Sequence, residues 1–190
     1  MKKGIVATCF LIGSILLSLI ALASCSSAPQ PPQSNTGVQV ISLDASWAKI
    51  YHSFTDLKHD ADLVVQGTVT RVLQTTAPTS GTPPSTDFQF TVSRVLQDPA
   101  HRLQGTTLTL HQTGAKVGNT LYQIDDDPLF QVGEQHILFL HEYQPGDYFV
   151  LGGPSGRFVI QNGAVKPINN EGVSYAGGSL NSFLTQVQRA

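Results

Sequence analysis

Apolar and polar residues alternate over several short stretches from residue 63 onward, a pattern typical of strands with one buried face. In residues 63–73 the odd positions are predicted to point inward, and in 87–96 and 106–111 the even positions are. The predicted inward residues are Leu63, Val65, Val69, Leu73, Phe88, Phe90, Val92, Leu108 and Leu110. His111 falls on the polar side of its stretch. The alternation therefore predicts three half-buried strands.

Later stretches predict further strands and a closing helix. Residues 135–141 contain an unbroken apolar run at 137–140, which indicates a central strand covered on both faces. Residues 147–151 and 157–161 predict two more strands, with the Asn162-Gly163 pair as a hairpin turn. Residues 74–86 are expected to be a long, mobile hairpin loop. Apolar residues at helical spacing behind Ser179 predict a capped C-terminal helix, and they are Leu180, Phe183, Leu184 and Val187.

The stretch before residue 60 has two interpretations. If residues 45–58 form one helix, five apolar side chains share one face at i, i+3, i+4 and i+7 spacing. They are Trp47, Ile50, Tyr51, Phe54 and Leu57. The other interpretation is a short helix capped by Thr55 that ends at about Asp60.

Five or six short strands, a short helix before the first and a C-terminal helix predict a mainly β fold. The architectures that fit are a small barrel and a β-sandwich. We expect residues 41–190 to form this single β-rich domain.

The N-terminus carries the pattern of an exported chain. Lys2 and Lys3 precede an apolar stretch at 4–22, which ends in the segment Leu22, Ala23, Ser24, Cys25. This segment closely resembles the lipobox of bacterial lipoproteins, whose cysteine is lipidated before cleavage. The resemblance implies that residues 1–24 are a cleaved signal peptide and that Cys25 carries a diacylglycerol thioether, often with a further acyl chain. Two or more chains anchor a protein stably where one does not.

The expected location is therefore the bacterial cell envelope, with the chain anchored to the membrane on its extracytoplasmic side. Ser26 is not the aspartate that retains such proteins at the inner membrane, so the sequence allows a location in the outer membrane if the host has one. Residues 25–40 are predicted to be the lipidated cysteine and an extended tether, because 26–39 contain three prolines and no charge.

The low charged fraction and the negative net charge of the chain limit the classes of ligand that it is expected to bind. Only 13% of residues are charged, about half of the roughly 25% typical of soluble domains. Removal of Lys2 and Lys3 leaves nine basic residues against 13 acidic ones, a formal charge of −4. Nucleic-acid binding is therefore not expected, since it needs a basic surface.

The order of the β segments also resembles the netrin-like domain of the tissue inhibitors of metalloproteinases, a barrel of the oligonucleotide/oligosaccharide-binding (OB) type. The resemblance implies that the small barrel, if it forms, is OB-like. Three segments within 55–141 carry this resemblance: HDADLVVQGTVTRVL, FQFTVSRVLQD and GEQHILFL. Those inhibitors chelate the protease zinc with a free N-terminal cysteine. A lipidated Cys25 on a tether is not available for that role, so the inhibitory mechanism does not carry over.

Two segments come close to catalytic motifs but depart from them. In GGPSGR (152–157), Arg157 stands where a nucleophile elbow needs glycine and β residues follow, so a tight turn is predicted. In HEYQP (141–145), Pro145 replaces the second histidine of a zincin motif, and the segment continues a strand. His136 and His141 are five apart, which places them on opposite faces of that strand.

Two sets of residues are weak metal candidates. His52, Asp56 and His59 would share one face of a 45–58 helix that extends slightly further, although a solvated polar face explains them better. Asp125 and Asp127, with Asp126 between them, suggest a weak calcium site, but a solvated acidic loop is the better reading. No cofactor motif is present in the sequence.

These observations leave two function hypotheses. The first is a non-catalytic interaction or ligand-binding module, not an enzyme, that meets an envelope protein or small ligand through the 74–86 and 112–132 loops. The second is an envelope hydrolase or metal-dependent enzyme with a dispersed site, for which His111, Asp125, His136 and His141 are the candidates. Convergence of those four side chains in a pocket would favour the second.

Overall fold

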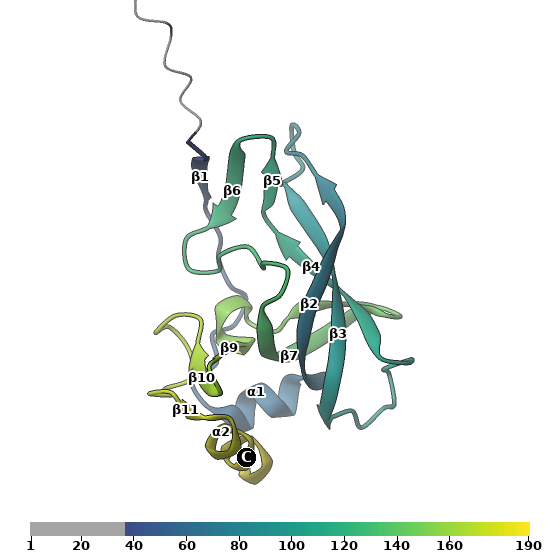
Figure 1. Cartoon of the computed structure of the whole chain (residues 1–190), viewed down its shortest axis with the longest axis vertical. Helices are drawn as coiled ribbons and strands as arrows, with labels where there is room; N and C mark the ends of the chain where they lie inside the picture. Colours follow the sequence, from purple (N-terminus) through teal and green to yellow (C-terminus); the bar gives the residue numbers. More distant parts are fainter. Residues whose placement is uncertain (1–36) are drawn as a thin grey trace, which may run out of the picture. The chain divides into compact units, whose positions relative to one another are not determined.

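The alternating segments of the sequence close into a five-stranded barrel in the computed structural model, which describes residues 37–190 (Figure 1). The barrel strands are β2 (Leu63–Thr76), β3 (Ser85–Gln97), β4 (Thr107–Thr113), β7 (Gln135–Gln144) and β8 (Asp147–Val150). β2, β3 and β4 pair antiparallel in sequence order, β4 pairs parallel with β8, and β7 joins β8 to β2. This is the strand order of an OB-like barrel. The prediction of a mainly β, OB-like fold is confirmed, since strands take 49% of the structure and helices 14%.

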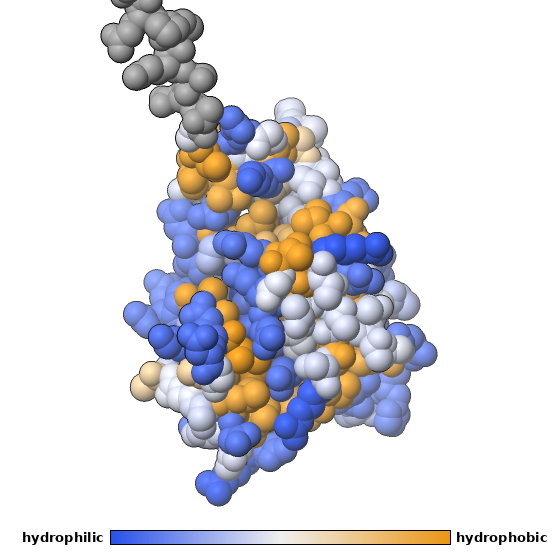
Figure 2. Space-filling view, in the orientation of Figure 1, coloured by the Kyte–Doolittle hydropathy of each residue, from blue (hydrophilic) through white to orange (hydrophobic). Residues whose placement is uncertain are grey.

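Further strands extend the barrel. β9 (Arg157–Gln161), β10 (Ala164–Pro167) and β11 (Gly178–Ser179) continue the sheet outward from β7. A separate three-stranded sheet has the order β1 (Gln39–Leu43), β6 (Thr120–Ile124) and β5 (Ala115–Val117), with β1 parallel to β6. Val38 and Val40 are more than half exposed beside this sheet, where Figure 2 shows apolar surface.

The two expected loops have different outcomes. β2 ends at Thr76 and β3 begins at Ser85, so residues 77–84 connect the two strands and the hairpin predicted over 74–86 is confirmed, with only its ends in strand. The 112–132 segment contains the end of β4 and the whole β5–β6 hairpin. The interpretation of 112–132 as one loop was therefore wrong in part, because β6 is completed by the distant strand β1.

The helix before the first barrel strand is the short one. α1 spans Phe54–Asp60, and its N-cap is Ser53, whose Oγ accepts a hydrogen bond from the backbone N–H of Asp56 at 3.0 Å. The 45–58 helix was wrong, and so was Thr55 as the cap. α2 (Leu180–Arg189) is capped by Ser179 as predicted.

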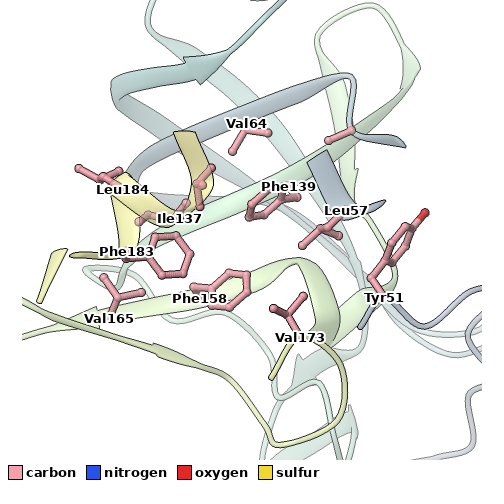
Figure 3. Packing of buried hydrophobic residues seen from close by; sticks show 12 residues of the cluster. Tyr51, Leu57, Val64, Ile137, Phe139, Phe158, Val165, Val173, Phe183 and Leu184 are labelled. Carbon is pink, nitrogen blue, oxygen red and sulfur yellow. The ribbon is translucent and has the colours of Figure 1, made fainter. Parts of the chain in front are cut away.

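The chain builds two cores that share strands β2 and β7. The barrel interior holds side chains such as Leu63, Val65, Phe90 and Leu138. The second core lies between the outer side of the sheet and the two helices, and Figure 3 shows Phe139, Phe158 and Phe183 meeting there with Leu57 of α1. Alternate residues of the 137–140 run therefore enter different cores. The prediction of a strand covered on both faces is confirmed.

β2 departs from strict alternation. Its pairing with β3 shifts register at four places, including Val69/Arg71 and Val72/Gln74. Leu73, which was predicted to point inward, is 43% exposed because the shifts and the length of the β2–β3 arm carry it beyond the barrel core. Gly67 lies where the ring of Phe90 and the backbone of Thr91 come so close that a Cβ would overlap both.

The GGPSGR segment forms the turn that was predicted for it. Gly153–Gly156 make one 3₁₀ turn (η1), and strand β9 follows directly from Arg157. No nucleophile elbow is formed, since that motif requires a helix after the serine.

The predicted signal peptide, Cys25 and residues 25–36 of the tether lie outside the described residues. The last two tether residues, Gln39 and Val40, belong to β1. Within residues 37–190 no helix has the length and apolarity needed to cross a membrane.

Candidate functional site

The segment between β1 and α1 is an irregular strap that polar contacts fix at both ends, to the residues after β6 and to α1. Ser42 Oγ donates to Asp125 Oδ1 at 2.6 Å, and the Trp47 indole N–H donates to Asp126 Oδ2 at 3.0 Å. Further along, Tyr51 O–H donates to Asp60 Oδ2 at 3.0 Å. Because the strap is fixed on both sides of Trp47, its indole has a defined position.

Two consecutive glycines make room for the strap. A Cβ on Gly152 would lie 2.7 Å from Cδ2 of Tyr51, and one on Gly153 would lie 2.4 Å from Cη2 and Cζ3 of Trp47, in steric overlap with the indole. Both glycines have positive φ, +64° and +55°, a region that other residues rarely adopt. The GGPSG segment therefore serves the close packing of Trp47 and Tyr51.

Two small clefts flank Trp47. One has a volume of about 230 Å³ and is bounded also by His111, Gln112 and Asp127. The other has a volume of about 290 Å³ and is bounded by Lys49, Tyr51 and the backbone of the glycine pair. Both clefts share the side chains of Trp47, Phe149 and Val150. The indole thus stands between two hollows of the surface.

A line of exposed rings continues from these clefts across the outside of the barrel, and we call it the aromatic row. It consists of His111 on β4, Tyr143 and His141 on β7, and Phe149 on β8. Ring centroids are 6.0 Å apart for His111 and Tyr143, 6.3 Å for Tyr143 and Phe149, and 5.1 Å for Phe149 and His141. Each of the four side chains is between 38% and 48% exposed.

Carboxylates surround the aromatic row. His111 Nδ1 lies 2.6 Å from Asp87 Oδ1, and His141 Nδ1 lies 2.7 Å from Asp62 Oδ2. Burial, and then the charges of Asp147 and Asp87, raise the pKa of Tyr143. The phenol therefore stays neutral at physiological pH, in a field of negative sign.

A second group of charges is buried on the inner side of the sheet. The Arg157 guanidinium is 1% exposed and donates through Nη1 to Asp127 Oδ1 at 3.1 Å and to the carbonyl of Pro128. Its Nη2 lies 3.4 Å from Glu134 Oε2, and its carbon lies 3.7 Å from the centre of the Phe130 ring. Arg157 thus holds the 125–134 segment against the barrel.

His136 completes this buried group. Its Nε2 lies 3.2 Å from Glu134 Oε2, and its ring meets Phe130 edge to face at 5.1 Å. Burial lowers the pKa of His136 despite the nearby carboxylate, and burial raises the pKa of Asp127 despite Arg157. Burial also opposes ionisation of Glu134, but His136, the N–H of Gln131 and Arg157 outweigh it and lower the pKa of Glu134.

The four residues of the dispersed-site hypothesis go to three places. His111 and His141 lie in the aromatic row, with a different carboxylate partner each, and His136 is buried beside Glu134. Asp125 is exposed and contacts Ser42. Among the hydrogen bonds of residues 37–190, none joins any two of these four side chains.

The metal candidates are likewise apart. His52 is exposed and precedes the cap of α1, while His59 Nδ1 lies 2.8 Å from Asp60. Of the three adjacent aspartates, Asp127 is buried against Arg157, so the solvated-loop reading fails for that residue. In the part of the chain that the structure describes, no three His, Cys, Asp or Glu side chains are grouped so as to hold a metal ion.

Sequence reasoning missed the aromatic row and the role of Trp47. A partial signal was present: alternation at 147–150 buries Tyr148 and turns Phe149 outward. The pairing of β4 with β8, which brings His111 next to this strand, has no local signal in the sequence.

No model of a known protein family matches the chain, and no curated protein is significantly similar to it.

Proposed function

We propose that this protein is a non-catalytic ligand-binding module, held at a bacterial envelope membrane by lipid on Cys25, and that its contact surface is the aromatic row with the clefts beside Trp47. The observation that carries the proposal is the series of neighbouring, partly exposed rings from His111 to His141, whose member Phe149 also bounds both clefts beside Trp47. Contiguous exposed aromatic surface of this kind is typical of binding sites. The proposal keeps the function expected from the sequence but assigns it to the aromatic row in place of the 74–86 and 112–132 loops.

The rigidity of the site supports the proposal. Trp47 is fixed by its hydrogen bond to Asp126 and by the glycine pair beneath it, and both row histidines are oriented by carboxylates. Residues that are already in place lose little conformational entropy when a ligand binds. Tyrosine and tryptophan side chains are also enriched at interfaces.

The position of the site on the barrel adds support by analogy of fold. OB barrels bind ligands over their second and third strands and the loop between their fourth and fifth. The corresponding elements are β3, β4 and the β7–β8 turn, and the aromatic row lies on β4, β7 and β8. Membership of the netrin-like group stays a prediction.

The alternative function is a hydrolase, because the pairs His111–Asp87 and His141–Asp62 resemble the base and its orienting carboxylate in such enzymes. Such a pair needs a nucleophile within hydrogen-bonding reach. Within residues 37–190, no serine, threonine or cysteine side chain forms a hydrogen bond with His111 or His141, which favours binding over catalysis.

The test is a pull-down of the intact, lipidated protein from its native envelope. Deleting 112–132 would remove Phe130 and Asp127 from the core, so point substitutions are preferable. We expect a Tyr143→Ser/Phe149→Ser variant to lose the envelope component that the unmodified protein retains. The control is Val72→Ser/Val95→Ser, which removes apolar side chains of similar exposure from the β2–β3 arm.

Identical retention by all three proteins would contradict the proposed contact surface. The anchor is tested separately with Cys25→Ala, which we expect to abolish palmitate labelling and sedimentation with membranes. Unchanged labelling would contradict the lipid assignment.

A further inference from the structure

The charges around the aromatic row have one dominant sign. Asp62 and Glu142 share a single cation, Arg102, whose Nη2 lies 3.1 Å from Asp62 Oδ1. Among the side chains of residues 37–190, Asp87 is paired only with His111, and Asp147 only with Gln144. These are four carboxylates against one guanidinium, a net charge of −3 when the histidines are neutral.

Aromatic rings that lie beside carboxylates without matching cations favour the binding of a positively charged ligand. The face of a ring attracts an ammonium or guanidinium group, and the attraction grows when carboxylates stand beside it. Guanidinium groups also stack on rings and donate to carboxylates at the same time. An anionic polymer would meet repulsion from the same groups.

The spacing of the rings matches an extended peptide. Neighbouring centroids in the row are 5.1 to 6.3 Å apart. Side chains at alternate positions of a strand are about 6.6 Å apart, since each residue advances about 3.3 Å. Two basic residues at alternate positions would therefore meet two neighbouring rings, such as those of Tyr143 and Phe149 at 6.3 Å.

We infer that the aromatic row binds an extended, basic segment of a partner protein, with arginine or lysine side chains over Tyr143 and Phe149 and their charges towards Asp87, Asp147 and Asp62. This inference rests on the proposed function, because it names the ligand class of the same surface. The Nε2 edge of each row histidine adds a hydrogen-bonding group at either end of the row.

The test uses the full chain in detergent and two blocked peptides, Gly-Arg-Gly-Arg-Gly and the same peptide with citrulline in place of arginine. Citrulline keeps the shape of arginine and removes its charge. We expect the arginine peptide to bind at least about tenfold more tightly, with affinity that falls between 50 mM and 500 mM salt. A chito-oligosaccharide serves as the neutral glycan probe.

Two substitutions locate the binding. Asp147→Asn is expected to weaken the arginine peptide about three- to fivefold, and Tyr143→Leu at least as much. Glu171→Gln, which removes the same charge at an exposed position outside the row, is expected to have no effect. Equal melting temperatures of the variants confirm that the fold is retained.

The outcomes separate this inference from the proposed function. Equal binding of both peptides, or tighter binding of the glycan lost in Tyr143→Leu, would overturn the cationic ligand and leave the contact surface in place. Absence of binding by the arginine peptide would also overturn it, and the pull-down would then decide the proposed function alone.

Discussion

Arg157 connects the barrel to the 125–134 segment. It pairs with Asp127, donates a hydrogen bond to the carbonyl of Pro128 and lies over the ring of Phe130. Removal of one partner of a buried ion pair leaves the other charge without compensation, which costs about 3–5 kcal/mol. Arg157→Met is therefore expected to lower the free energy of unfolding by that amount in urea titrations. Asp127→Asn in the same chain should restore part of the loss, since the unpaired carboxylate is then gone.

A loss below about 1 kcal/mol for Arg157→Met, or a double variant no more stable than the single one, would show that this ion pair does not stabilise the fold.

His136 makes stability depend on pH. Its pKa is lowered by burial from the ordinary 6.5, so below that pH the unfolded chain takes up a proton that the folded protein does not. Stability from this residue is present above pH 6.5 and is lost as the pH falls through the folded pKa. Between pH 7.5 and 5.5 we expect a loss of stability, measured by urea unfolding, that is absent from His136→Gln.

His52→Gln is the matched control, because His52 is exposed. An equal pH dependence in the native protein and in His136→Gln would exclude His136 as its source.

The burial of single residues could be predicted in part from the sequence. Phe88, Phe90, Leu108 and Leu110 are buried as alternation predicts, since each belongs to a strand with one face in the barrel. Arg157 could not be predicted to be buried, because its partners lie 23 to 30 positions away and charged residues are usually exposed.

Strand β2 illustrates how one element depends on a single small residue. At Gly67 the ring of Phe90 takes the place of a side chain, with its Cε1 2.6 Å from where a Cβ would lie. Gly67→Ala must therefore push β2 away from β3. Overpacking of this kind costs about 2–3 kcal/mol, which we expect as a lowered midpoint in urea.

Gly37→Ala is the control, because a Cβ there meets nothing within 4 Å. If both variants unfold at the same urea concentration, the close approach of β2 and β3 at Gly67 is not needed.

The elements that could be predicted are those with a local signal. The 135–141 strand, the Asn162-Gly163 turn and the capped C-terminal helix each carry their pattern within a few residues. β5 and β6 do not, because β6 is completed by β1, which is more than 70 positions earlier in the chain. The strap around Trp47 allowed a helical interpretation beside the short-helix one because its apolar residues have helical spacing, although they pack on a glycine pair about 100 positions later.

For the whole molecule, the proposed arrangement is a lipid on Cys25, a tether, and a barrel whose outer face carries the aromatic row. The sequence indicated the barrel through its strand count, but it did not indicate the row, which requires β4, β7 and β8 to be adjacent. Adjacency of strands is set by closure of the barrel and not by local pattern.

The most direct test of the row as the contact surface is site-specific photo-crosslinking in the intact cell envelope. A photoreactive residue is placed at Phe149 in one protein and at Val72 in another, both on exposed strand positions. We predict a discrete adduct from position 149 that disappears with Tyr143→Ser, and none from position 72. No adduct at 149, or the same adduct from both positions, would contradict the account.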